Sequence, residues 1–125
     1  MEGLKKKILV IDNEPAFLAL IKDSLDSQRY DFEVALDGTE GLLKVAASKP
    51  DLILLDLNMP HMDGMEFLRK LNEQYKKDKI PIIITTNDPS MDKITEGVAL
   101  GIRGYVVKVE ESLRQIASTI DSVFA

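Results

Sequence analysis

The sequence predicts an α/β domain, a doubly wound five-stranded parallel sheet with helices on both faces. Five short apolar runs alternate along the chain with five longer segments in which apolar residues recur at helical spacing. Three of the five runs are apolar at nearly every position, which is typical of strands covered on both faces. Because neighbouring parallel strands need crossover connections, this alternation of strands and helices favours a parallel sheet.

The predicted strands coincide with the apolar runs, which are Ile8–Ile11, Phe32–Ala35, Leu52–Leu55, Ile82–Thr85 and Gly104–Val107. The first, third and fourth are the continuously apolar ones, so we expect helices against both of their faces. One common order for five such strands is the flavodoxin-like order 2-1-3-4-5. That order rests on analogy, because periodicity alone cannot give it.

The predicted helices follow the strands one by one. The first begins near Pro15, whose missing N–H is harmless in the first turn, and carries an apolar stripe at Phe17, Ile21 and Leu25. The remaining helices are expected after the turn Asp37-Gly38 and over about Met65–Gln74, Ser90–Leu100 and Leu113–Phe124.

Composition narrows the class of protein. The chain has 125 residues, 45% of them apolar, which predicts one domain over residues 1–125 without a linker or a repeat. It has no Cys and one His, which excludes disulfide scaffolds, thiolate zinc sites and His-rich metal sites. The net charge of −5 has the wrong sign for a direct nucleic-acid partner. No apolar run reaches the roughly 18–20 residues of a membrane span, so we expect a cytoplasmic protein with no membrane partner.

Polar residues follow four of the strands at the point where each strand ends. They are Asp12-Asn13-Glu14, Asp56, Thr86 and Lys108. Each has an ordinary alternative role, such as capping the next helix or lying on the surface. Ligands of open parallel sheets nevertheless bind outside the carboxyl ends of the strands, where these residues would converge. Asp56 directly follows four apolar residues, a place where a carboxylate is costly without a cation.

These residue types indicate phosphoryl transfer. Two carboxylates from neighbouring strands offer the hard oxygen ligands that Mg²⁺ prefers. A carboxylate beside a metal can also act as a nucleophile and form an aspartyl phosphate. Lys108 and the Thr86 hydroxyl would then contact the phosphoryl oxygens as charge accumulates on them.

Four segments of the chain resemble the receiver domain of bacterial two-component response regulators. They are ILVIDNEP at residues 8–15, DLILLDLNMP at 51–60, PIIITT at 81–86 and GYVVK at 104–108. The resemblance implies that Asp56 accepts a phosphoryl group from a sensor histidine kinase or a phosphotransfer protein. It also implies that Mg²⁺ is held by Asp12, Asp56 and the backbone carbonyl of Asn58, and that Lys108 contacts the phosphoryl group.

The same resemblance implies a conformational switch. Thr86 and Tyr105 would be the switch pair, which remodels the surface of the fourth helix, fifth strand and fifth helix for an output domain or a target protein. Asn58 and Asp88 would tune hydrolysis of the phosphoryl group. Such a protein is a signalling module and not an enzyme in the turnover sense, although it assists its own phosphorylation and dephosphorylation. Homodimerisation through the switch surface stays open.

Asn13 departs from the family pattern, because it occupies the second place of an acidic pair. Its amide oxygen can still coordinate a metal but brings no charge. Asp12, Asp56 and Lys108 then carry a net charge of −1, where an acidic residue 13 would give −2. We therefore expect weaker Mg²⁺ binding and slower phosphorylation than is usual in the family.

Two further departures keep an alternative function open. Val109 replaces a proline after Lys108, which predicts a trans peptide bond there. Asn87 replaces a small residue and would crowd access of the phosphoryl group. With Asn13, these residues favour a pseudo-receiver, an interaction module that is not phosphorylated. The intact Asp56, Thr86 and Lys108 oppose it.

An enzyme is the third candidate, a phosphatase of the haloacid-dehalogenase type with an Asp nucleophile. That family needs Asp-x-Asp after its strand, and this chain has Asp56-Leu57-Asn58. The second acid needed for general acid–base catalysis is therefore missing.

Overall fold

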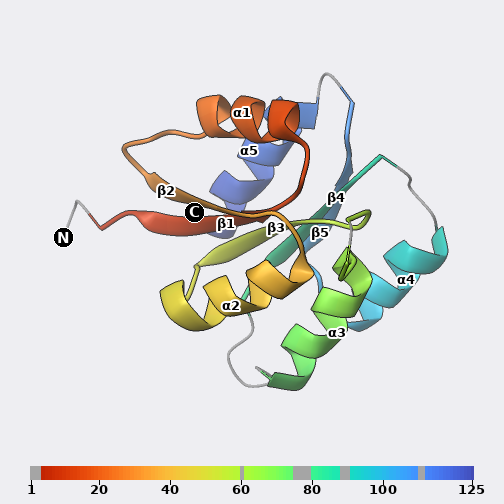
Figure 1. Cartoon of the computed structure of the whole chain (residues 1–125). Helices are drawn as coiled ribbons and strands as arrows, with labels where there is room; N and C mark the ends of the chain where they lie inside the picture. Colours follow the sequence, from red (N-terminus) through yellow and green to blue (C-terminus); the bar gives the residue numbers. More distant parts are fainter. Residues whose placement is uncertain (1–3, 60, 75–79, 88–90, 110–111) are drawn as a thin grey trace.

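Five parallel strands form the centre of the molecule (Figure 1). The computed structural model describes residues 4–59, 61–74, 80–87, 91–109 and 112–125. The strands are β1 (Lys6–Ile11), β2 (Tyr30–Ala35), β3 (Leu52–Asp56), β4 (Ile82–Thr86) and β5 (Gly104–Val107). They pair in the order β2-β1-β3-β4-β5, and every neighbouring pair is parallel. The predicted fold class and strand order are confirmed.

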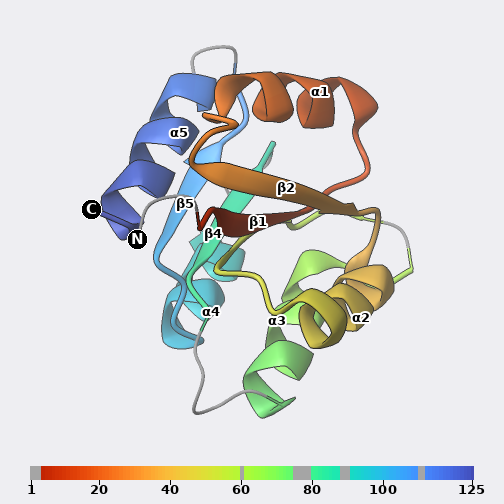
Figure 2. The ribbon, with the colours of Figure 1, turned by 90° about the vertical axis from the view of Figure 1, so that its left-hand side faces the viewer.

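Helices cover both faces of this sheet. They are α1 (Pro15–Ser24), α2 (Gly38–Ser48), α3 (Gly64–Gln74), α4 (Met91–Ala99) and α5 (Ser112–Val123). Helices α1 and α5 lie on one face and α2, α3 and α4 on the other, as the two perpendicular views show (Figures 1 and 2). Ser90, the predicted start of the fourth helix, lies outside the described residues. In the part of the chain that is described, no helix combines the length and the apolar character needed to cross a bilayer.

Strand β3 shows why the sheet needs two helical layers. Its apolar side chains alternate between two cores, with Leu52 and Leu54 packed among residues of α1 and α5. Ile53 and Leu55 pack instead among residues of α2 and α3. All four side chains are fully buried, as the continuously apolar run predicts.

Backbone pairing continues past the strands and fixes the polar residues at the carboxyl edge of the sheet. The Asp12 N–H donates to the Ala35 carbonyl at 2.9 Å, and the Lys108 N–H donates to the Thr86 carbonyl at 2.7 Å. Asp56 and Thr86 are themselves the last residues of β3 and β4, each one residue beyond the predicted strand end. The Lys108–Val109 peptide bond is trans, as predicted, since none is cis among the residues described.

Candidate functional site

Asp12, Asp56 and Lys108 meet in a closed cluster at the carboxyl edge of the sheet, as predicted. The Lys108 Nζ atom lies 2.6 Å from Asp12 Oδ2 and 3.7 Å from Asp56 Oδ2. The side chains of Lys108, Asp12 and Asp56 are 5%, 0% and 3% exposed. Buried charges of this kind are stable only when they are paired, so the ammonium and the two carboxylates depend on one another.

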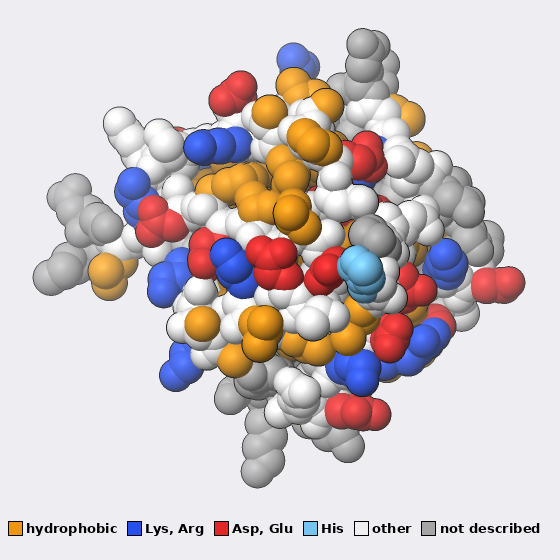
Figure 3. Space-filling view, in the orientation of Figure 1, with side chains coloured by type: hydrophobic (Ala, Val, Ile, Leu, Met, Phe, Trp, Pro, Cys, Tyr) orange, Lys and Arg blue, Asp and Glu red, His pale blue; other side chains and the backbone are white. Residues whose placement is uncertain are grey.

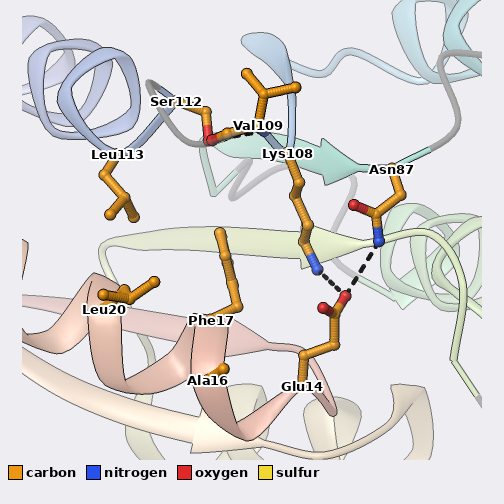
Figure 4. Close-up of a pocket in the computed structure, with 9 residues that line it drawn as sticks. All are labelled: Glu14, Ala16, Phe17, Leu20, Asn87, Lys108, Val109, Ser112 and Leu113. Carbon is orange, nitrogen blue, oxygen red and sulfur yellow. Dashed lines mark hydrogen bonds and ion pairs between the residues drawn. The ribbon is translucent and has the colours of Figure 1, made fainter.

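Glu14 belongs to the same cluster, and the sequence did not single it out as a ligand. Its Oε1 atom lies 2.7 Å from Lys108 Nζ and accepts a bond from Asn87 Nδ2 at 3.3 Å (Figure 4). The Glu14 N–H donates to Asp12 Oδ1 at 2.9 Å, a short-range bond that bends the chain back toward the site. Asn87 was expected to crowd the site, and its exposed amide instead binds the Glu14 carboxylate.

Phe17 forms part of the support of Lys108. Its ring centroid lies 4.3 Å from Lys108 Nζ, within the range of a cation–π contact. The ring is nearly buried and comes from the apolar stripe of α1. Helical spacing predicts Phe17 as a core residue, but the ammonium beside its ring comes from the residue that follows β5, whose position periodicity cannot give.

The Asp56 carboxyl is held in an unfavourable environment. Burial raises its pKa from 3.8 to about 6, and the neighbouring charge of Asp12 acts in the same direction. Lys108 and the Asn58 N–H, which donates to Asp56 Oδ1 at 3.3 Å, partly oppose this shift. A further cation bound in the site would therefore stabilise the ionised form of Asp56.

The charges of Lys108 and Glu14 are stabilised by their contact. The hydrogen bond to Lys108 lowers the pKa of Glu14. Burial by itself would lower the pKa of Lys108, but the bonds to Asp12 and Glu14 outweigh it, and the pKa is raised. Lys108 is thus a permanent cation that lies beside a buried carboxylate.

The cluster fits a hard divalent cation such as Mg²⁺. One carboxylate oxygen from each of Asp12, Glu14 and Asp56 lies within 4.8 Å of the other two. Asp12 Oδ2 is completely buried, and its contact in the described structure is the ion pair with Lys108 Nζ at 2.6 Å. A set of oxygen atoms with excess negative charge is what Mg²⁺ prefers. Asn13 is exposed, and the metal contact expected of the Asn58 carbonyl stays a prediction.

Gly64 brings the loop after Asp56 back against the strand. Its N–H donates to the Leu57 carbonyl at 3.1 Å. A Cβ atom at residue 64 would lie 2.8 Å from Leu57 Cα and would also collide with the Asp56 carbonyl oxygen. This approach requires glycine, because the atoms in the way belong to the backbone of the residue that carries the central carboxylate.

The expected switch residues lie at different depths. Thr86 is fully buried at the end of β4, whereas Tyr105 on β5 is 45% exposed. A buried hydroxyl and a half-exposed ring on neighbouring strands fit a pair that changes position, but the switch itself stays a prediction. Asp88, the other residue expected to tune hydrolysis besides Asn58, lies outside the described residues.

An apolar cavity of about 470 Å³ opens beside the cluster, between α1 and α5. Lys108, Glu14 and Phe17 form part of its wall, and Leu20 and Val109 are 51% and 57% exposed at it (Figure 4). On the face turned toward the viewer in Figure 3, charged side chains form a band across the middle with apolar side chains above and below. The cavity itself, with Leu20 and Val109 exposed beside Lys108, is surface next to the cluster that a protein partner can cover.

The chain is similar throughout to one family. The family model of the response regulator receiver domain matches residues 8–121. The alkaline phosphatase synthesis transcriptional regulatory protein PhoP of Bacillus subtilis is 40% identical over 106 residues, which are 84% of this chain and 43% of that protein. The transcriptional regulatory protein TrcR of Mycobacterium tuberculosis is 35% identical over 107 residues, which are 86% of this chain and 41% of that protein.

Solved structures agree with the sequence matches. The chemotaxis protein CheY4 of Vibrio cholerae is 31% identical, with a TM-score of 0.85 over 96% of this chain and 99% of that one. The chain spans less than half the length of the two curated relatives, whose names describe transcriptional regulators. With the match over nearly its whole length and the predicted strand order in place, the chain belongs to the family of response regulator receiver domains.

Proposed function

We propose that this receiver domain accepts a phosphoryl group on Asp56, in the presence of Mg²⁺, and passes the signal on through a change of surface. Members of the family are signalling domains and not enzymes with sustained turnover. The observation that carries the proposal is the position of Asp56, a buried carboxylate 3.7 Å from the Lys108 ammonium and beside Asp12. The single ammonium there does not balance the carboxylates of Asp12 and Asp56, and a bound Mg²⁺ would supply the positive charge that phosphoryl transfer needs.

The reaction needs a donor in which phosphorus is bound to a histidine nitrogen. An Asp56 oxygen attacks phosphorus, the P–N bond breaks, its electron pair returns to the donor imidazole, and an acyl phosphate forms on Asp56. Mg²⁺ held by Asp12 and Asp56 would neutralise charge on the transferred group. Lys108 turns from its carboxylate partners toward a phosphoryl oxygen, and the Thr86 hydroxyl donates a hydrogen bond to another.

The ionisation of Asp56 permits this step near neutral pH. A carboxyl with a pKa of about 6 is mostly ionised at pH 7 and can act as a nucleophile. Such a carboxylate is also more basic than an exposed one. Hydrolysis of the acyl phosphate by water would reverse the modification, and Asn58 and Asp88 are the residues expected to tune its rate.

The donor is expected to be a sensor histidine kinase or a phosphotransfer protein. The cavity between α1 and α5 supports this, because its apolar wall carries Leu20 and Val109 and it reaches the polar atoms of Lys108. An apolar side chain of a partner helix seated there would bring the donor close to Asp56. The partner would thus bind through apolar contact in the cavity and deliver the phosphoryl group to Asp56, which lies beside the Lys108 ammonium.

The surface formed by α4, β5 and α5 is proposed to change on phosphorylation and to transmit the signal to a binding partner. Inward movement of the Thr86 hydroxyl would draw the half-exposed Tyr105 ring inward and change this surface. An output domain or a separate target protein would bind it, and a second copy of the chain is a further candidate. Direct binding of nucleic acid by this domain is not proposed, because its net charge is −5.

Intact mass after incubation with acetyl phosphate and Mg²⁺ tests the proposal. One added phosphoryl group is expected in the native domain and in Asp23→Asn, which removes an exposed carboxylate on α1. None is expected in Asp56→Asn. An unmodified native domain, beside a known receiver that is modified in parallel, would instead support the pseudo-receiver.

Sustained release of phosphate from a generic phosphate ester would support the phosphatase. That measurement separates an Asp nucleophile that turns over from one that is modified and switches. The receiver proposal expects no multiple turnover in this assay.

A further inference from the structure

Residues 13 and 14 differ in exposure and contacts. Asn13, which occupies the place of the second acid, is exposed. Glu14 is 46% exposed, and its carboxylate is directed inward to Lys108 Nζ at 2.7 Å. The residue that follows the acidic pair in sequence therefore reaches the site (Figure 4).

We propose that Glu14 supplies the Mg²⁺ site with the carboxylate that Asn13 lacks, and that Asn87 positions it. The inference rests on the proposed function, which gives the domain its need for the metal. Oxygen atoms of Glu14, Asp12 and Asp56 lie within 4.8 Å of one another, close enough for one small cation to contact more than one of them.

Charge supports this assignment. Three carboxylates and the Lys108 ammonium carry a net charge of −2, the value that an acidic residue 13 would give with Asp12, Asp56 and Lys108 alone. A divalent cation neutralises a cluster of this charge. The weak Mg²⁺ binding expected from Asn13 is therefore no longer expected once Glu14 is included.

Asn87 explains how a half-exposed side chain is held in place. Its amide Nδ2 donates to the same Glu14 oxygen that faces Lys108, at 3.3 Å. With Glu14 bound to Mg²⁺, the ammonium of Lys108 would lose one of its carboxylate partners and would be available to Asp56 or its phosphoryl group. Glu14 then accounts for two departures from the family pattern, because it replaces the charge that Asn13 lacks and is bound by Asn87.

Calorimetric titration of the full chain with MgCl₂ tests the assignment without any phosphoryl donor. Glu14→Gln keeps the size and the hydrogen-bonding oxygen of the side chain but removes its charge, and its Kd for Mg²⁺ is expected to rise by about tenfold. Asn13→Ala and the exposed control Glu73→Gln are expected to change Kd by less than about twofold. Asn87→Ala is expected to raise Kd by a smaller factor than Glu14→Gln.

A rescue keeps the test independent of folding. The double variant Glu14→Gln/Asn13→Asp returns a carboxylate to residue 13 and is expected to recover most of the native affinity. An unchanged Kd in Glu14→Gln, a larger effect in Asn13→Ala, or no Mg²⁺ binding by the native domain would each overturn the inference. Failure of Asp56 phosphorylation in a native domain whose Mg²⁺ affinity depends on Glu14 would overturn the proposed function alone.

Discussion

The interior of the sheet and its carboxyl edge are built by the same strands with opposite energetics. Leu54 and Ile83 in the interior are fully buried and apolar, so their burial stabilises the fold. Asp12 and Asp56 at the edge are buried to nearly the same degree but are charged, and their desolvation costs free energy. The edge therefore keeps its structure because the burial of the interior stabilises the fold, and its excess negative charge favours the binding of a metal cation.

Truncation of the interior should have the largest effect on stability. Leu54→Ala removes a fully buried side chain from between β3 and the α1–α5 layer. The free energy of unfolding is expected to fall by about 2–5 kcal/mol, measured by urea denaturation followed by circular dichroism. The control Leu43→Ala, at a side chain that is 68% exposed, should stay within about 0.5 kcal/mol of the native value. Equal effects of the two variants would contradict the assigned core.

Removal of the negative charge of Asp56 at the carboxyl edge should raise the free energy of unfolding, whereas truncation of the interior lowers it. Asp56→Asn removes a carboxyl whose pKa is raised from 3.8 to about 6, so at pH 7 without Mg²⁺ it should stabilise the domain by at most about 3 kcal/mol. The native state binds more protons than the unfolded state between these two pKa values. The contribution of the Asp56 carboxyl to the free energy of unfolding is therefore fully present below about pH 4, and it is lost as the pH rises to about 6.

Urea denaturation of both proteins at pH 5, 6 and 7.5 checks the sign. The advantage of Asp56→Asn should be full at pH 7.5 and should shrink toward pH 5. Added Mg²⁺ should stabilise the native domain and have a smaller effect on the variant, because ligands stabilise the state that binds them. A variant that is less stable than the native domain at pH 7.5 would show that Asp56 is stabilising where it lies.

Addition of one methyl group at Gly64, between the interior and the carboxyl edge, should have a smaller effect on the free energy of unfolding. Gly64→Ala places a Cβ atom against the backbone of Asp56 and Leu57, at 2.8 Å from Leu57 Cα. The free energy of unfolding is expected to fall by about 1–3 kcal/mol, and phosphorylation by acetyl phosphate should slow because the loop that carries Asn58 must shift. Gly104→Ala is the matched control, since its nearest neighbour, Thr119 Cγ2, would be 4.0 Å away. Equal stability of the two variants would contradict the close approach at residue 64.

The sequence predicted most of the fold because the signals are local and repeated. Continuous apolar runs identified β1, β3 and β4, and parallel strands bring their carboxyl ends to one edge, so Asp12, Asp56 and Lys108 could be predicted to converge. The ends of β3 and β4 were placed one residue short, because Asp56 and Thr86 are polar and yet belong to the ladder. A polar residue in a buried strand is the place where local pattern and function conflict.

Glu14 and Phe17 could not be assigned to the site from the sequence for a different reason. A residue just beyond a strand has no periodicity that fixes its direction, and the inward turn of Glu14 depends on the bond between its N–H and Asp12 Oδ1. Phe17 follows helical spacing, but its contact with Lys108 joins residues that are far apart in the chain. Contacts of this kind need the register of the sheet and the placement of α1 together.

The smallest expected effect on stability lies at the opposite end of the sheet. There a buried hydroxyl is hydrogen-bonded but takes no part in the proposed reaction. The Tyr30 hydroxyl, at the start of β2, donates to Asp121 Oδ1 at 2.5 Å, and burial raises its pKa from 10 to about 12. Tyr30→Phe should lower the free energy of unfolding at pH 7 by about 1 kcal/mol and leave phosphorylation of Asp56 unchanged. Tyr105→Phe, at a ring that is 45% exposed, is the control for stability and should change it little.

The contributions of Tyr30 and Asp56 to stability can be told apart by their dependence on pH. The Tyr30 hydroxyl stays protonated in the native state up to about pH 12, so its contribution to stability is present below pH 10 and is lost as the pH rises toward 12. Native and Tyr30→Phe proteins should therefore lose their difference in alkali, whereas native and Asp56→Asn proteins should lose theirs in acid. A Tyr30→Phe variant that altered phosphorylation would mean that the two ends are coupled through β1, and the division between a stabilising interior and an independent reactive edge would fail.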